Sequence, residues 1–111
     1  DVSGDVRATG NVYSANPVLS GRTTSYSVGP LDYYIGMSNG QTINLPLGST
    51  LTTGKQYIIK DESGLAGTFV GYRVTVATSS PDLIDGQNSV ILAINYGAVN
   101  LIWTGSFWSI F

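Results

Sequence analysis

Clusters of Gly, Pro, Asn, Asp and Ser divide this chain into short segments in which apolar and polar residues alternate. No window carries apolar residues at the i, i+3, i+4, i+7 spacing of an amphipathic helix over three turns. Alternation with a period of two, in segments about 8–12 residues apart, is typical of a β-sandwich or barrel. The segments are 23–28, 32–37, 42–46, 55–61, 72–77, 90–95, 98–103 and 108–111. The sequence therefore predicts an all-β fold, a small antiparallel sandwich or barrel-like knob.

Low charge restricts what this domain can bind and how it is stabilised. Charged residues make up 11% of the 111 residues, against about 25% in typical globular chains. The five basic residues are scattered, so no basic stripe favours binding to a nucleic-acid backbone. No apolar run approaches the ~18 residues of a membrane span. Because the chain has no cysteine to form disulfides, we expect a small β domain of this kind to gain stability by oligomerising.

Residues 1–22 differ from the rest of the chain in their pattern of apolar and turn residues. Isolated valines stand between turn residues, at Val2, Val6, Val12 and Val18. Such residues cannot form a core within one chain. We interpret the segment either as a shaft-like β segment wound with identical neighbours, whose symmetry supplies the missing core, or as a flexible linker. Residues 23–111 form the predicted knob domain.

The carboxylates of the chain do not favour an enzyme. There is no histidine, which excludes histidine-based acid–base and triad chemistry. Asp61 and Glu62 are adjacent, and on a strand they would point to opposite faces, so they make a poor acid–base pair. We expect them instead to accept hydrogen bonds from the turn 63–67. Asp82 and Asp85 share an oxygen-rich loop that lacks the ligand spacing of a calcium loop. The sequence predicts a non-enzymatic protein with no metal site and no cofactor.

Six short motifs fall in an order that resembles a recurring module of bacteriophage tail fibres and tailspikes. They are DYYIG and TINLP, followed by YIIKDESGLAG, LIDG, INYGAVNL and TGSFW. The segment ATGNVYS near the start is similar to fibre-shaft sequence. The resemblance covers most of residues 1–111. It implies a homotrimeric, all-β, virion-associated domain, often at the tip of a fibre that touches the host, and it implies no active site.

The resemblance and the residues together predict a non-enzymatic, trimeric phage fibre or spike domain. Such a domain lies on the virion, outside the host cell, and presents a host-receptor-binding surface, for which a glycan is one candidate ligand. Two alternatives stay open. One is a carbohydrate-binding module that uses exposed aromatic rings, and the other is a purely structural module for trimerisation or virion attachment. We expect neither nucleic-acid binding nor membrane insertion.

Aromatic residues are the candidate ligand contacts. Where the family pattern tends to small or polar residues, this chain has Trp103 and Phe107 on either side of a Gly-Ser turn, which suits type II′. Burial at a subunit interface is one reading of this pair, and a platform on which a sugar stacks is the other. Tyr33 and Tyr34 form a second cluster, and on a strand one of the two rings would face outward.

Three further expectations concern packing. Within the closing stretch, the expected core residues are Ile94, Val99, Leu101 and Trp108. Asn39-Gly40 suits a type I′ hairpin turn. The apolar residue Phe111 is expected to be covered by a neighbouring subunit.

Overall fold

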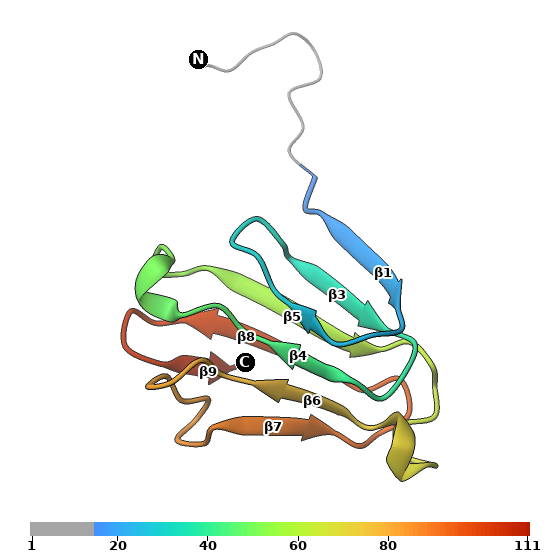
Figure 1. Cartoon of the computed structure of the whole chain (residues 1–111). Helices are drawn as coiled ribbons and strands as arrows, with labels where there is room; N and C mark the ends of the chain where they lie inside the picture. The colour runs from blue at the N-terminus through green and yellow to red at the C-terminus, as the bar shows by residue number, and fades with distance from the viewer. Residues whose placement is uncertain (1–14) are drawn as a thin grey trace, which may run out of the picture.

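The computed structural model describes residues 15–111, so predictions for residues 1–14 lie outside the described residues. Nine β-strands and two short 3₁₀ helices make up the described chain (Figure 1), which confirms the predicted all-β fold. The strands are β1 (Val18–Arg22), β2 (Tyr26–Ser27), β3 (Tyr34–Met37), β4 (Thr42–Asn44), β5 (Gln56–Asp61), β6 (Val74–Ala77), β7 (Ser89–Leu92), β8 (Ala98–Trp103) and β9 (Trp108–Ile110). The 3₁₀ helices are η1 (Gly48–Thr50) and η2 (Val70–Tyr72). No helix in the described part is long and apolar enough to cross a membrane.

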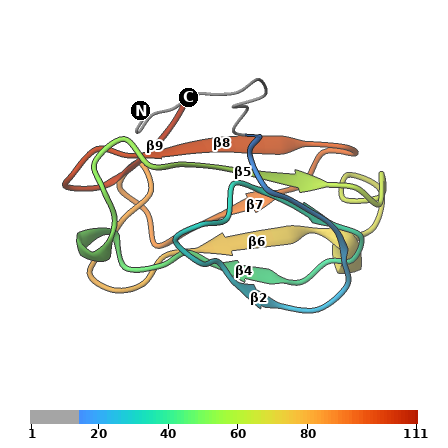
Figure 2. The ribbon, with the colours of Figure 1, turned by 90° about the horizontal axis from the view of Figure 1, so that it is seen from above.

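The strands form two sheets that pack face to face. Sheet I has the order β1-β3-β5-β8-β9, and sheet II has the order β2-β4-β6-β7. The first six strands alternate between the sheets, so the chain winds around the core once for every two strands. Figure 2 shows β5 and β8 of sheet I in one layer and β2, β4 and β6 of sheet II in the other.

This winding makes most of the strand pairs parallel. Neighbours within a sheet are one circuit of the chain apart and therefore run in the same direction, as in β1–β3, β3–β5, β2–β4 and β4–β6. Only the later pairs β5–β8, β6–β7 and β8–β9 are antiparallel among the described strands. The predicted two-sheet architecture is correct, whereas its predicted antiparallel pairing is wrong, because both sheets are mixed.

The predicted turns have different outcomes. The Asn39-Gly40 turn joins strands of different sheets, β3 and β4, so it does not form the predicted hairpin. The β8–β9 hairpin does form, with Trp103 opposite Trp108. Gly105 has φ +101° there, the sign that the first central residue of a type II′ turn requires.

The N-terminal segment 1–22 contributes its last five residues to sheet I as β1. Val18 lies beside Tyr34 and Leu19 beside Ile35 in the parallel ladder with β3. Residues 18–22 therefore pair with β3 as the edge strand of sheet I.

One apolar core lies between the sheets. Alternate residues of each strand point into it, as in β5, where Tyr57 and Ile59 are fully buried and their neighbours are half-buried. Trp108 closes this core, because its ring centroid lies 5.7 Å from that of Tyr57 and 5.3 Å from that of Trp103. The predicted burial of Val99, Leu101 and Trp108 is confirmed. Ile94 is 73% exposed, so its predicted place in the core is wrong; it follows the end of β7.

Neighbouring residues of the β8–β9 hairpin allow a direct test of this core. Trp108→Ala should lower the free energy of unfolding by about 3–5 kcal/mol, because it leaves a large cavity beside two aromatic rings. Phe107→Ala should change it by about 0.5 kcal/mol or less, since the Phe107 side chain is 47% exposed. Urea denaturation of both variants at one protein concentration measures the difference. Equal losses would contradict the assignment of Trp108 to the core.

Candidate functional site

A buried carboxylate organises one end of the sandwich. Asp61, the last residue of β5, is 0% exposed. It accepts hydrogen bonds from the Ser63 N–H at 3.0 Å, the Ser63 hydroxyl at 2.5 Å, the Ala66 N–H at 3.1 Å and the Tyr96 N–H at 3.1 Å. Burial alone would raise the pKa of Asp61, but these hydrogen bonds outweigh it and lower the pKa below its usual value. Asp61 therefore fixes both its own turn and the reversal at Tyr96.

The adjacent carboxylate binds a different part of the chain. Glu62 accepts hydrogen bonds from the Ser20 hydroxyl, the Gly21 N–H at 2.7 Å and the Tyr34 hydroxyl at 2.7 Å. It lies across Gly36, where a Cβ atom would come within 2.1 Å of the carboxyl carbon. Burial opposes the ionised form, yet these donors and the Lys60 charge lower the pKa of Glu62. The expected bonding to the following turn is thus confirmed for Asp61 and wrong for Glu62, which holds β1.

The four aromatic residues predicted as ligand contacts do not form one site. Trp103 is only 4% exposed and packs on Trp108, so its ring lies in the core of its own chain. Tyr34 is half-buried, and burial together with its bond to Glu62 raises its pKa to about 12. Tyr33 is also half-buried. Only Phe107 is exposed, in the β8–β9 turn.

Instead, exposed apolar side chains gather on two loops at the end where Asp61 lies. We name Phe69, Val70, Ile94 and Tyr96 the loop-end surface; they are 54–73% exposed. Asn95 joins their loops, because its side-chain oxygen accepts from the Gly67 N–H at 2.8 Å and its amide nitrogen donates to the Thr68 hydroxyl at 3.0 Å. The Lys60 ammonium donates to the Tyr96 carbonyl at 2.7 Å. An apolar groove of about 220 Å³, lined by 91–94, Gly97 and Ala98, continues this surface.

No pattern in the sequence marks the loop-end surface directly. Its residues lie in two segments that are distant in the chain, and hydrogen bonds to Asp61 and Asn95 bring these segments together. Tyr96 carries one local sign of a special role, a positive φ of 59°. Such a backbone angle is uncommon for a bulky residue.

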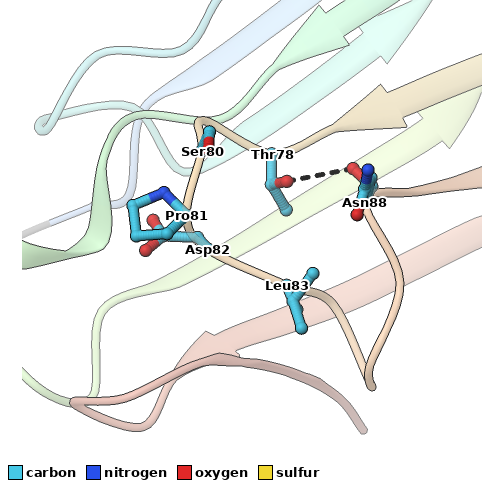
Figure 3. Close-up of a pocket in the computed structure, with 6 residues that line it drawn as sticks. All are labelled: Thr78, Ser80, Pro81, Asp82, Leu83 and Asn88. Carbon is cyan, nitrogen blue, oxygen red and sulfur yellow. Dashed lines mark hydrogen bonds between the residues drawn. The ribbon is translucent and has the colours of Figure 1, made fainter.

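A small polar hollow lies at the opposite end of β6, in the loop between β6 and β7. Its volume is about 130 Å³, and its lining residues, drawn in Figure 3, are Thr78, Ser80, Pro81, Asp82, Leu83 and Asn88. The Thr78 hydroxyl donates to the Asn88 carbonyl at 3.0 Å, the dashed line of Figure 3. Asp82 is 9% exposed and accepts from the Gly48 N–H at 2.7 Å, which ties this loop to η1.

The two aspartates of the same loop, Asp82 and Asp85, have separate roles. Among the described residues, no group of three His, Cys, Asp or Glu side chains converges. Asp82 is engaged by Gly48, whereas Asp85 occupies a tight turn with positive φ at Asp85 (46°) and Gly86 (85°). Two successive positive φ angles define a type I′ turn, so Asp85 and Gly86 are the central residues of the turn that reverses the chain.

Neither protein-family models nor curated proteins match this chain. The fold therefore defines the class: a two-sheet all-β domain in which the first six strands wind alternately between the sheets. Within that class, the features available for recognition are the loop-end surface, the hollow and the outer faces of the sheets.

Asp61→Asn should lower the free energy of unfolding at neutral pH by about 1–3 kcal/mol. The Asn NH₂ group would face N–H and O–H groups that need an acceptor, so these groups would lose a hydrogen bond. The folded-state pKa values of Asp61 and Glu62 are lowered. The two carboxylates therefore stabilise the fold fully at pH values above their unfolded-state pKa values near ~4. This stabilisation is lost as the pH falls through their folded-state pKa values. Urea titrations between neutral and acidic pH should show this loss, reduced in Asp61→Asn.

Asp85→Asn is the matched control, because Asp85 is exposed and Asn tolerates its positive φ. It should leave both the stability and its pH dependence close to those of the parent chain. If Asp61→Asn behaved like Asp85→Asn, the buried network would have no stabilising role.

Proposed function

We propose that this chain is a non-enzymatic, homotrimeric domain of a bacteriophage fibre or spike, carried on the outside of the virion, that contacts a receptor on the host cell. The motif order described above supports this proposal. So does the part played by the IKDESG motif, whose Asp61 and Glu62 hold neighbouring loops and strands and perform no evident chemistry. The proposal requires no cofactor and no nucleic acid.

A contrast between the two outer faces carries the trimer proposal. Because side chains alternate along a strand, the partly exposed residues of each strand identify its outer face. On sheet I, Val18, Tyr34 and Ile58 are neighbours in register, and Ile102 lies on the next strand; the polar residues Gln56, Lys60 and Asn100 share this face. The outer face of sheet II carries Ser27, Thr42, Asn44, Thr75, Ala77 and Ser89, and its one large apolar side chain among the described strands is Ile91. Sheet I is therefore the face that gains most from burial against other copies of the chain.

The edge of sheet I strengthens this choice. Ile110 is 40% exposed and Phe111 is 60% exposed beside the edge strand β9. The 83–85 loop bonds the outer edge of β9, so these exposed apolar side chains, and not free backbone groups, favour association with another chain. In the proposed trimer, a neighbouring subunit covers Phe111, as expected from the sequence.

The loop-end surface is the proposed receptor contact. It lies where β1, β3 and β5 end together, since Arg22, Met37 and Asp61 are successive partners across sheet I. The described chain begins beyond the other end of β1, as Figure 1 shows, which leaves this end clear of residue 15. Three copies of one weak surface raise avidity in a trimer.

Light scattering tests the trimer. The parent chain should have the mass of three copies at micromolar concentration, and Ile102→Glu should dissociate it by placing a charge in the apolar interface. Ile91→Glu is the control, because Ile91 is 58% exposed on the edge strand of sheet II. A monomeric parent chain would refute the proposal, and dissociation by Ile91→Glu alone would move the interface to sheet II.

Binding to bacterial cells tests the receptor contact. The fluorescently labelled trimer should bind at least one strain of a bacterial panel in flow cytometry. The double change Phe69→Ala and Ile94→Ala should weaken this binding about tenfold or more, since exposed anchors dominate such contacts. Leu31→Ala is the control, because Leu31 is 82% exposed outside the loop-end surface. Unchanged binding by the double variant, with the trimer intact, would exclude this surface.

A further inference from the structure

The hollow between β6 and β7 has walls that are already fixed. The two ends of its loop are joined, because the Thr78 N–H and hydroxyl both donate to the Asn88 carbonyl at 3.0 Å. Ile84 is 0% exposed and anchors the loop in the core, while Asp82 anchors it to Gly48. The Trp108 N–H donates to the Leu83 carbonyl at 2.9 Å, which adds a bond to the β8–β9 hairpin. A ligand would therefore bind with little loss of loop entropy.

Several polar groups around the hollow are available to a ligand. In the described part of the chain, neither the Ser80 hydroxyl nor the Asn88 side-chain amide makes a hydrogen bond, and both residues are exposed. The Thr78 hydroxyl uses its proton on Asn88 and keeps lone pairs that can accept. Pro81 and Leu83 add aliphatic surface beside these groups. Donors, acceptors and aliphatic surface together match a sugar ring, which has hydroxyls at its edge and C–H groups on its faces.

The charge and the size of the hollow restrict the class of ligand further. No Lys or Arg lines the hollow, and its single charged residue is Asp82, so an anion such as a phosphate is disfavoured. The volume of about 130 Å³ lies well below the ~300–1,000 Å³ of pockets for drug-sized ligands. It suits one monosaccharide residue and excludes a deeply buried oligosaccharide.

We propose that this hollow is a binding site for a single neutral sugar residue, with Asn88 and Ser80 as its hydrogen-bonding side chains. The site lies within one chain and at the other end of β6 from the loop-end surface. It is therefore distinct from the proposed receptor contact. Its loop also bonds β9 beside the proposed trimer interface, so light scattering of each variant separates loss of sugar binding from loss of the trimer. The affinity is expected to be millimolar.

Nuclear magnetic resonance titration of the full chain tests the site. Glucose, galactose, mannose and N-acetylglucosamine are each added at millimolar concentrations to the ¹⁵N-labelled protein. At least one should shift the backbone amides of 78–88 and the Asn88 side-chain amide. Asn88→Ala and Ser80→Ala should each weaken this binding about fivefold or more, because each removes a hydrogen bond.

Asn44→Ala is the matched control, since Asn44 is exposed on the outer face of sheet II, and it should bind like the parent chain. Spectra that overlay away from the loop establish that each variant is folded. The proposal is overturned if no sugar causes shifts, if the shifts fall outside 78–88, or if Asn88→Ala binds normally. Tighter binding of glucose 6-phosphate than of glucose would also overturn it, because the site would then prefer an anion.

Discussion

The arrangement of the second half of this chain depends on one buried carboxylate. Asp61 ends β5 in sheet I, and its side chain also accepts the Tyr96 N–H, in the reversal through which the chain passes from β7 of sheet II to β8 of sheet I. The Asp61 N–H donates in turn to the Gly97 carbonyl at 2.8 Å. An unpaired charge at 0% exposure would cost several kcal/mol. The fold offsets this cost only when the 63–66 turn and the reversal are both in place, which couples loop formation to the pairing of β5 with β8.

Alternation in the sequence revealed the strands but not their partners. The segment 98–103 coincides with β8, and most other predicted segments overlap a strand. Alternation usually indicates antiparallel sheets, because parallel sheets are commonly covered on both faces and read as continuous apolar runs. Here the chain winds around a single core, so even its parallel strands have one open face and alternate. The sequence does not predict that β1 joins sheet I, because Ser20 and Gly21 interrupt its apolar pattern and Glu62, distant in sequence, stabilises it.

The aromatic residues show which parts of a site a sequence can and cannot disclose. Trp103 follows Val99 and Leu101 at intervals of two, so the alternation itself places it on the inner face of β8. That local signal is a better guide than the departure from a family pattern. The loop-end surface and the hollow have no such signal. They depend on contacts such as Gly67 with Asn95 and Asp82 with Gly48, which join segments 28 and 34 residues apart.

Both ends of the sandwich use the same physical device. Asp61 and Asp82 are the buried charged residues of the described chain, and each accepts backbone N–H groups from a loop of its own end. Rigid loops lose little conformational entropy on binding, so even small contact areas can give useful affinity. The core takes both tryptophans, so the aromatic rings exposed on the described surface are those of phenylalanine and tyrosine residues such as Phe69 and Tyr96. In the proposed trimer, recognition would fall to pre-organised loops, each of which can bind weakly and gain from being repeated.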